Sequence, residues 1–109
     1  MSGQPAVKRR LHQADVVYLY DGSFEGFLCC VYESFAHHEL PFAVWPPQQE
    51  TATLYPVKEI PTRPDLAQRV FASFRTRLGP ETEYLVSRDF LSGQPDKELL
   101  LIRFLHLAY

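Results

Sequence analysis

The first strong pattern in the chain is an apolar run that ends at a polar turn and is followed by a helical periodicity. Residues 16–20 are β-branched, aromatic or aliphatic without alternation, which predicts a strand covered on both faces. The Asp-Gly pair at 21–22 favours a turn, and Ser23 is placed to cap an amphipathic helix. Because Pro41 disfavours helical backbone in the residue before it, we expect this helix to end by residues 39–40.

Patterns of the same kind predict one more strand and three more helices. A short apolar stretch at residues 53–60 predicts a strand, and Pro56 inside it predicts an edge position, because proline cannot donate to a ladder. Helices are expected over residues 64–78, 81–91 and 97–109. Together these elements predict an α+β domain in which a small two-stranded sheet carries about four packed helices.

Two stretches are predicted to lack regular structure. Residues 1–15 form a polar lead-in that we expect to be mobile, and residues 41–50 form a proline-rich loop around Trp45. A chain of 109 residues is short enough for a single domain at most. We therefore expect one domain over residues 16–109.

The last predicted helix is apolar around most of its circumference, and such a helix is usually buried on several sides. The sequence also stops at Tyr109 without a glycine, a proline or a polar tail that would mark a helix end. We expect the chain to be the N-terminal part of a larger protein, and the alternative is self-association through this helix. Its apolar residues are Leu99, Leu100, Leu101, Ile102, Phe104, Leu105 and Leu107.

Composition narrows the class of protein. Hydrophobic residues make up 46% of the chain, enough for a core, and a net charge of −2 argues against a global basic field for nucleic acid. No apolar run approaches the roughly 20 residues that span a bilayer, so no membrane partner is expected. Cys29 and Cys30 are adjacent, and a disulfide between neighbours is strained, so we expect free thiols in a reducing cytoplasm. We expect no cofactor.

Residues 17–35, V-Y-L-Y-D-G-S-F-E-G-F-L-C-C-V-Y-E-S-F, resemble the opening of a bacterial family of DNA-metabolism and DNA-repair proteins. An R-V-F segment at residues 69–71 and an F-L-S-G…E-L-L-L segment at residues 90–101 agree with the same family layout. The resemblance covers nearly all of residues 16–109. The residues that carry its motif are Asp21, Gly22, Ser23 and Gly26.

The resemblance implies a role in DNA repair but does not indicate which chemical reaction, if any, the domain performs. Members of this family occur beside a radical-SAM protein associated with DNA, or are fused N-terminally to a uracil-DNA glycosylase superfamily domain. The resemblance therefore implies an accessory domain of DNA repair that binds DNA or a partner enzyme of one of these two kinds. It also implies that the family domain continues beyond Tyr109.

Two enzymatic alternatives follow from the residues of the first helix. Glu33 and His37 are spaced i, i+4 and share a face that Cys29 could join, which is a pattern found in helical metal sites. Ser23 stands at a strand-to-helix turn and could serve a hydrolase as nucleophile. Cys30 could do so if His37 activated it, but the two residues are seven positions apart, about two helical turns. Against these, capping alone accounts for Ser23, and buried cysteines are often small core residues.

The second helix carries the candidate nucleic-acid contacts. Arg69, Arg75 and Arg77 could form a basic strip, because arginine makes bidentate contacts with phosphate. Arg88 and the basic residues 8–10 could extend this strip. The alternative is an ordinary solvated helix face. A strip on one surface would favour nucleic acid, whereas a reactive serine, cysteine or histidine in a pocket would favour an enzyme.

Overall fold

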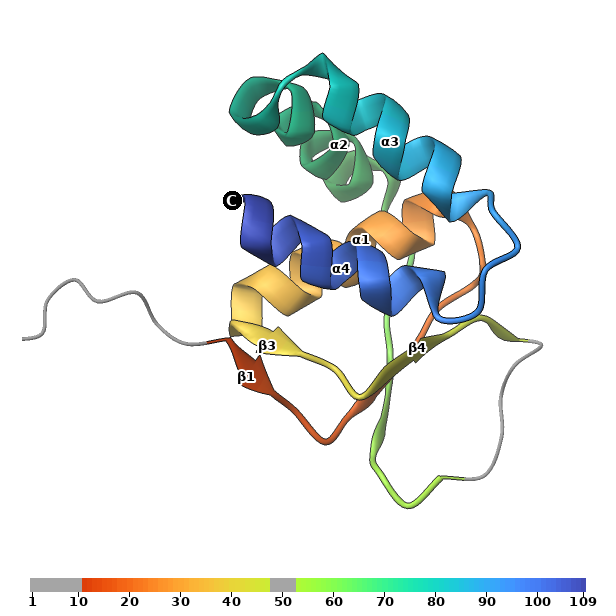
Figure 1. Cartoon of the computed structure of the whole chain (residues 1–109). Helices are drawn as coiled ribbons and strands as arrows, with labels where there is room; N and C mark the ends of the chain where they lie inside the picture. The colour runs from red at the N-terminus through yellow and green to blue at the C-terminus, as the bar shows by residue number, and fades with distance from the viewer. Residues whose placement is uncertain (1–10, 48–52) are drawn as a thin grey trace, which may run out of the picture.

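The described residues of this computed structural model are 11–47 and 53–109, and they confirm the predicted α+β class. In chain order the elements are β1 (His12–Gln13), β2 (Val17–Leu19), α1 (Phe24–His37), β3 (Glu39–Leu40), β4 (Ala43–Trp45), β5 (Val57–Glu59), α2 (Pro64–Leu78), α3 (Pro80–Phe90) and α4 (Lys97–Ala108). In Figure 1 the helices lie above the strands, with α1 and α4 nearest to them and α2 and α3 above. The fold is therefore a layered one with a single helical side.

The strands form two small parallel sheets. Strand β1 pairs with β3, and a three-stranded sheet has the order β4-β2-β5. Hydrogen bonds from Ala14 N to Leu40 O and from Phe42 N to Val16 O continue the pairing between the two sheets. Strands β1 and β2 therefore form one bent segment of the chain, and β3 and β4 form a second bent segment that lies beside it.

Strand β4 is the main departure from the predicted sheet. Residues 41–50 were expected to be a proline-rich loop, but residues 43–45 pair in register with β2. A parallel pair needs a crossover, and α1 supplies it between β2 and β4. Residues 48–50 of the expected loop lie outside the described residues. Strand β5 is shorter than the predicted 53–60, and its edge position agrees with the position of Pro56.

The end of the predicted lead-in belongs to the fold. Ala14 is buried, Leu11 packs against the core, and His12 and Gln13 form β1. The expectation of a mobile segment is therefore wrong for residues 11–15. The rest of the lead-in, residues 1–10, lies outside the described residues.

Helix bounds follow the local signals closely. Helix α2 has the predicted bounds, and α3 begins one residue earlier than predicted, at Pro80. Helix α1 ends at His37, because His38 takes the left-handed conformation with φ of 53°. The His38 N–H bonds back to the carbonyls of Phe35 and Ser34, which closes the last turn.

Helix α1 is the most enclosed element of the fold. Residues 26–31 are all buried, although an amphipathic helix was expected. The sheet, α2 and α4 cover different sides of it. Phe27 and Cys30 are fully buried, and the two adjacent cysteines are free thiols inside this core.

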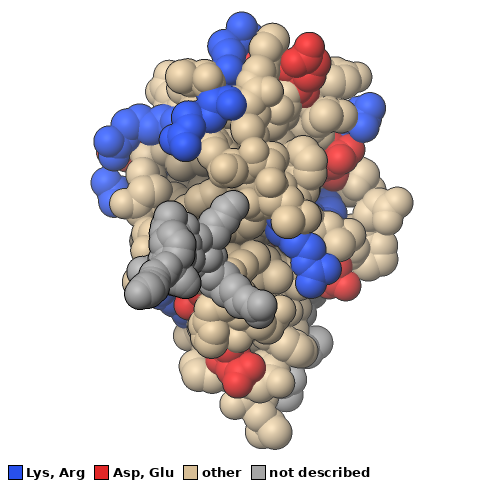
Figure 2. Space-filling model, turned by 60° about the vertical axis from the view of Figure 1, so that its left-hand side comes forward, with Lys and Arg blue, Asp and Glu red and all other residues tan. Residues whose placement is uncertain are grey.

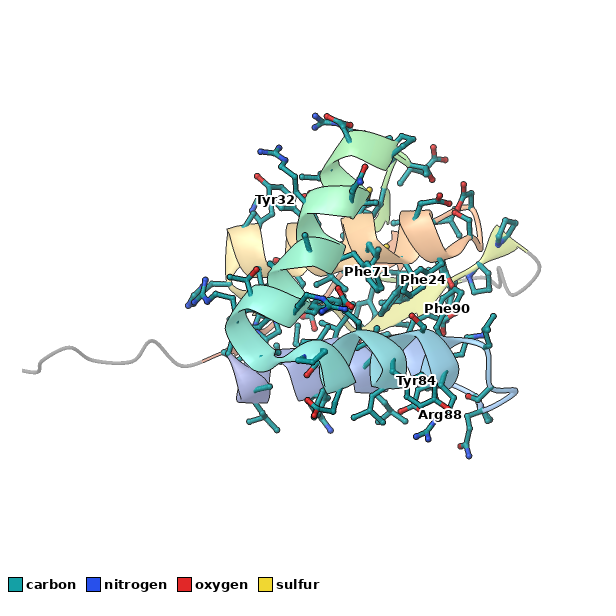
Figure 3. The ribbon with its side chains drawn as sticks, turned by 90° about the horizontal axis from the view of Figure 1, so that it is seen from above. Phe24, Tyr32, Phe71, Tyr84, Arg88 and Phe90 are labelled. Carbon is teal, nitrogen blue, oxygen red and sulfur yellow. The ribbon has the colours of Figure 1, made fainter. Side chains whose placement is uncertain are left out.

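A cluster of phenylalanines joins α1 to α2 and α3. The ring of Phe24 lies 5.8 Å from that of Phe71 and 5.2 Å from that of Phe90, measured between centroids. Figure 3 shows these three rings together between the helices, whereas Tyr84 and Arg88 lie on the outer side of α3. Edge and tilted contacts of this kind are the arrangements that aromatic rings prefer.

Helix α4 is buried on one side, so the expectation of burial on several sides is wrong for this fold. Leu101, Ile102 and Leu105 are in the core. The opposite row is open, with 53% of Leu100 and 82% of Leu107 exposed. Among the helices of residues 11–47 and 53–109, none has the length and apolar character needed to cross a membrane.

Candidate functional site: an aromatic and basic hollow between α1, α2 and α4

The turn between β2 and α1 is held by the carboxylate of Asp21. Its Oδ1 accepts hydrogen bonds from the Ser23 backbone N–H at 2.9 Å and the Ser23 hydroxyl at 2.6 Å, and its Oδ2 accepts one from Thr62 Oγ1 at 2.7 Å. These hydrogen bonds lower the pKa of Asp21, and the largest contribution comes from the Ser23 hydroxyl. Asp21 thereby joins the start of α1 to the segment before α2.

The other motif residues shape the same turn. Ser23 Oγ accepts the Gly26 N–H at 2.9 Å, so the predicted N-cap is confirmed. Gly22 has φ of 87°, a conformation that side chains rarely tolerate. A Cβ at Gly26 would overlap Asp21 Oδ1 and lie 3.0 Å from Thr62 Oγ1. Asp21, Gly22, Ser23 and Gly26 therefore have a structural role at this junction.

A hollow of about 540 Å³ lies at the carboxyl ends of the three parallel strands, where ligands often bind in α/β sheets. Its charged residues are Asp21 and Glu59, and the Asp21 carboxylate already accepts three hydrogen bonds. Two carboxylates disfavour an anionic ligand. This edge of the sheet therefore offers few groups for binding.

The candidate nucleophiles are not placed for catalysis. The Ser23 hydroxyl donates to an Asp21 carboxylate whose pKa is lowered, so no adjacent base is available to take its proton. Cys30 is fully buried, and burial raises the pKa of its thiol, which keeps it protonated. His37 is exposed and does not line any of the hollows described in this section.

The structure brings together two of the three predicted metal ligands, Glu33 and His37, but not Cys29. His37 Nε2 lies 3.0 Å from Glu33 Oε2, and the ammonium of Lys58 also contacts Glu33, so a lysine cation holds the position a metal would need. Cys29 points elsewhere, with its Sγ accepting the Arg63 N–H at 3.3 Å. In the part of the chain that the structure describes, no three His, Cys, Asp or Glu side chains form a metal-binding group.

The three predicted arginines divide between two sides of α2. Arg75 bonds to Glu83 of α3, with Nη2 and Nε at 3.0 Å and 3.2 Å from the same carboxylate oxygen. Arg77 lies over the ring of Tyr109, 5.1 Å from its centroid. Arg69, which is exposed, precedes Ser73 and Arg77 at spacings of four and eight residues, so these three share one helical row. We call Arg69, Ser73 and Arg77 the α2 row.

The face that carries the end of α2 is locally basic. In Figure 2, which turns the left-hand side of Figure 1 forward, Lys and Arg side chains gather at the upper left, and most of the visible Asp and Glu side chains lie to the right and below. The predicted single strip of three arginines is therefore reduced to two, because Arg75 is neutralised by Glu83. The basic residues 8–10 lie outside the described residues.

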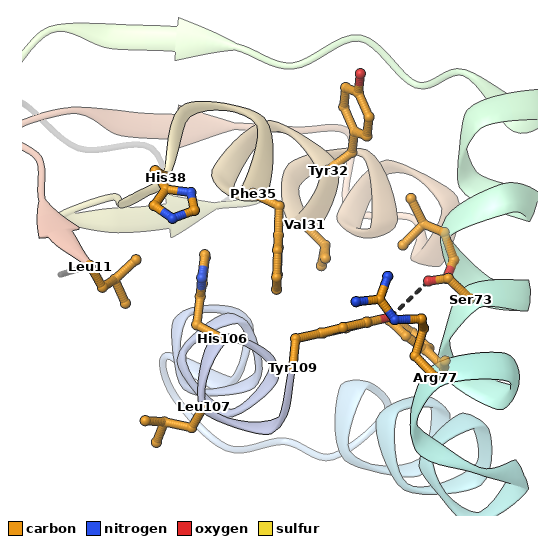
Figure 4. A pocket seen from close by; sticks show the side chains of 12 residues that line it. Leu11, Val31, Tyr32, Phe35, His38, Ser73, Arg77, His106, Leu107 and Tyr109 are labelled. Atoms are coloured by element: carbon orange, nitrogen blue, oxygen red, sulfur yellow. Dashed lines mark hydrogen bonds between the residues drawn. The ribbon is translucent and has the colours of Figure 1, made fainter. Parts of the chain in front are cut away.

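A hollow of about 660 Å³ opens beside the α2 row, between α1, α2 and α4 (Figure 4). It combines aromatic rings with basic and hydroxyl groups, and no acidic residue is among those that line it. The described residues around it are Leu11, Val31, Tyr32, Phe35, His38, Val70, Ser73, Phe74, Arg77, His106, Leu107 and Tyr109. We call it the α1–α2–α4 hollow.

Two parallel rings stand at the centre of this hollow. Phe35 and His106 stack with centroids 4.0 Å apart and an interplanar angle of 5°, and Tyr109 meets Phe35 edge-on at 5.2 Å. In Figure 4 the pair lies between His38 on one side and Arg77 with Tyr109 on the other. The Tyr109 and Ser73 hydroxyls are 2.7 Å apart and connect the end of α4 to the α2 row.

The protonation of His106 is set by its neighbours. Burial, with a smaller contribution from His38, lowers the pKa of His106, so the ring is neutral near pH 7. The Ser34 hydroxyl donates its proton to the Glu39 carbonyl. Ser34 Oγ, which lies 2.8 Å from His106 Nε2, therefore accepts a hydrogen bond from the His106 Nε2–H. The Nδ1 atom is then left as a hydrogen-bond acceptor.

Two tyrosine–carboxylate hydrogen bonds, one partly buried and one buried, join elements of the core. Tyr18 donates to Glu39, and Tyr20 donates to Glu98 at 2.6 Å. Glu98 is only 4% exposed, so the Tyr20 hydroxyl compensates a carboxylate that would be costly to bury alone. Burial is the largest cause that raises the pKa of both tyrosines. These bonds tie α4 and β3 to β2.

The sequence interpretation found Arg77 and missed most of this hollow. Tyr32, Phe35, His38, His106 and Tyr109 were not among the predicted site residues. His106 lies 72 positions from Ser34, so no spacing within one helix could indicate their contact. The available signal was the concentration of histidine and tyrosine at the ends of two helices.

Gly26→Ala tests the structural role of the motif. Alanine favours a helix over glycine by about 1 kcal/mol, but its Cβ would displace Asp21 or Thr62. We expect a net loss of about 1–3 kcal/mol in the free energy of unfolding, measured by urea titration. Gly93→Ala is the matched control, because a Cβ there has no neighbour within 4 Å. Equal stability of the two variants would contradict this role.

The lowered pKa of His106 predicts a pH dependence of stability. The unfolded chain binds the His106 proton more readily than the folded one, so stability present above pH 6.5 should fall as the pH drops below that value. His106→Gln keeps a donor for Ser34 but cannot titrate. Its free energy of unfolding should fall less than that of the unsubstituted protein between pH 7.5 and 5.5, measured by urea titration. Parallel pH profiles would show that His106 does not contribute.

Comparison with protein-family models, with curated proteins and with solved structures finds no match for this chain. The function must therefore be argued from the residues and their geometry. The aromatic and basic hollow is the arrangement with the most binding groups in the described part of the chain.

Proposed function

We propose that this protein is an accessory domain of DNA metabolism or repair that binds nucleic acid through the α2 row and the adjoining hollow. The observation that carries the proposal is the absence of any acidic residue among the described residues that line the α1–α2–α4 hollow, beside Arg77. A site with cationic and aromatic groups and no acidic side chain among its described residues suits a polyanion with exposed bases. The resemblance at residues 17–35 supports the same process.

The contrast between the arginines supports this choice of surface. Arg75 and Arg88 have carboxylate partners at 3.0 Å and 3.3 Å, whereas no ion pair with a described residue engages Arg69 or Arg77. An arginine already held by a carboxylate has less to gain from phosphate. Since the chain has a net charge of −2, binding would depend on this local patch and weaken steeply with salt.

The resemblance also suggests the kind of partner protein with which the domain would act. The domain would act with a radical-SAM protein or a uracil-DNA glycosylase-like domain, by presenting DNA to it. The hydrogen-bonding and stacking groups of the hollow support the proposal that the domain contributes DNA binding. Free, buried thiols at Cys29 and Cys30 are compatible with a reducing cytoplasm.

Fluorescence anisotropy with labelled oligonucleotides, across a range of salt concentrations, tests the proposal. Removing two phosphate contacts with Arg69→Ala/Arg77→Ala should weaken binding and lower the slope of log affinity against log salt by about 1.4 on single strands. Arg88→Ala is the matched control, since Arg88 also lies over a tyrosine ring, that of Tyr84, on another helix. Binding that is absent, or that is equally sensitive to both variants, would refute the proposed surface.

A second function, as a protein-interaction module, is favoured by the exposed row of α4. Leu100, Phe104 and Leu107 lie at helical spacing and are 53%, 43% and 82% exposed. Apolar rows of this kind commonly mark interfaces. We propose self-association through this row as the alternative role of the helix.

Light scattering after size exclusion measures this self-association. The unsubstituted chain should show a mass that rises with concentration above 12.6 kDa, and Leu100→Glu/Leu107→Glu should restore the monomer. Both side chains are exposed, so the fold should survive, which circular dichroism can check. A monomer at all concentrations would exclude this interface.

A further inference from the structure

The α1–α2–α4 hollow has the size and chemistry of a small-molecule site. Its volume of about 660 Å³ is within the range of ligand pockets, and its floor is apolar, formed by side chains such as Val31, Val70 and Phe74. Polar groups come from the other side chains of the lining, and six of the twelve described lining residues carry one. This division indicates a ligand with a flat apolar body and a polar or charged end.

The ring arrangement favours a planar ligand. The Phe35 and His106 rings are parallel and stack on each other, so a planar ligand would stack on an outer face of this pair, and Tyr109 adds an edge-on ring beside it. Because His106 bonds through Nε2 to Ser34, its free Nδ1 can accept a hydrogen bond from a ring N–H or an amino group. Nucleobases carry both a planar face and such donors.

The charge arrangement favours an anion at one end of the ligand. Arg77 stands at the Tyr109 side of the hollow, 5.1 Å from that ring, with the Ser73 hydroxyl nearby (Figure 4). Within the part of the chain that the structure describes, no carboxylate forms an ion pair with Arg77. The Ser73 hydroxyl already donates to the Val70 carbonyl at 2.6 Å, so the Arg77 guanidinium is the group with donors for a phosphate, which arginine can contact in a bidentate manner.

We infer that the α1–α2–α4 hollow holds one unstacked nucleotide, with its base beside Phe35, His106 and Tyr109 and its phosphate on Arg77. This inference rests on the proposed nucleic-acid function and adds a substrate class to it. A base inside a duplex is stacked on both sides and cannot enter such a hollow. The protein should therefore prefer single-stranded DNA or an unpaired base over a perfect duplex.

Titrations of the 109-residue chain with five kinds of small molecule test the site itself, by isothermal calorimetry or NMR. Deoxynucleoside monophosphates should bind at least tenfold more tightly than inorganic phosphate, deoxyribose 5-phosphate or the unphosphorylated nucleosides. Benzoate serves as a simple aromatic anion. Benzoate binding as tight as that of the nucleotides would overturn the assignment to a nucleotide, and so would inorganic phosphate binding equally well.

Tyr109→Ala tests the stacking contact on DNA, because Tyr109 is exposed and its removal should leave the fold intact. Losing one base–aromatic contact should weaken single-strand binding about fivefold or more and leave duplex binding unchanged. Tyr84→Ala is the matched control, since Tyr84 also pairs with an arginine, at 5.7 Å, but lies outside the hollow. Equal effects of the two substitutions would overturn the assignment.

The outcomes separate this inference from the function on which it rests. DNA binding that requires Arg69 and Arg77 but shows no single-strand preference and no effect of Tyr109→Ala would keep the proposed function and overturn the nucleotide site. Mononucleotide binding that is lost in Tyr109→Ala, without any binding of DNA, would keep the site and overturn the proposed function.

Discussion

Residues 26–31 of α1 are buried without interruption, and the other elements are arranged to cover them. The sheet covers one side of the helix, α2 covers another, and α4 closes a third. A helix enclosed in this way can carry polar groups only near its ends or where a partner satisfies them. Ser34 meets this condition by bonding to the Glu39 carbonyl and to His106. The burial of α1 thus decides where chemistry can occur on this fold.

Because the middle of α1 is buried, its polar groups lie at its two ends, and the two ends use them differently. At its N-terminus, Ser23 bonds to Asp21, and Asp21 also accepts a hydrogen bond from Thr62, so the polar groups there are already used. At its C-terminus, Phe35 is left beside a hollow with stacking and hydrogen-bonding groups that have capacity for a ligand. The Asp21–Gly26 turn maintains the fold, and the opposite end of the helix offers the binding groups.

The charges of α2 follow a similar division. Arg75 is held by Glu83 and helps to join α2 to α3, whereas Arg77 lies over Tyr109 at the hollow. A mildly acidic chain can contain a cationic site when its acidic residues lie elsewhere, and the lining of this hollow fits that condition. The net charge of the chain alone argues against nucleic-acid binding. It sums the charges of the whole surface, however, and a ligand contacts only part of that surface.

Local signals in the sequence determined the helices and the caps. Pro64 and Gly79 placed the ends of α2, Ser23 placed the start of α1, and Pro56 marked β5 as an edge. These features depend on residues within one or two turns of each other. The sequence could not place β4, the ordered residues 11–15 or the α1–α2–α4 hollow, because each depends on partners far away in the chain. Only the packing of α4 against α1 brings His106 to Ser34 and Phe35. A helix cap is determined by neighbouring residues, whereas a hollow and the burial of its lining depend on contacts between elements that are distant in the sequence.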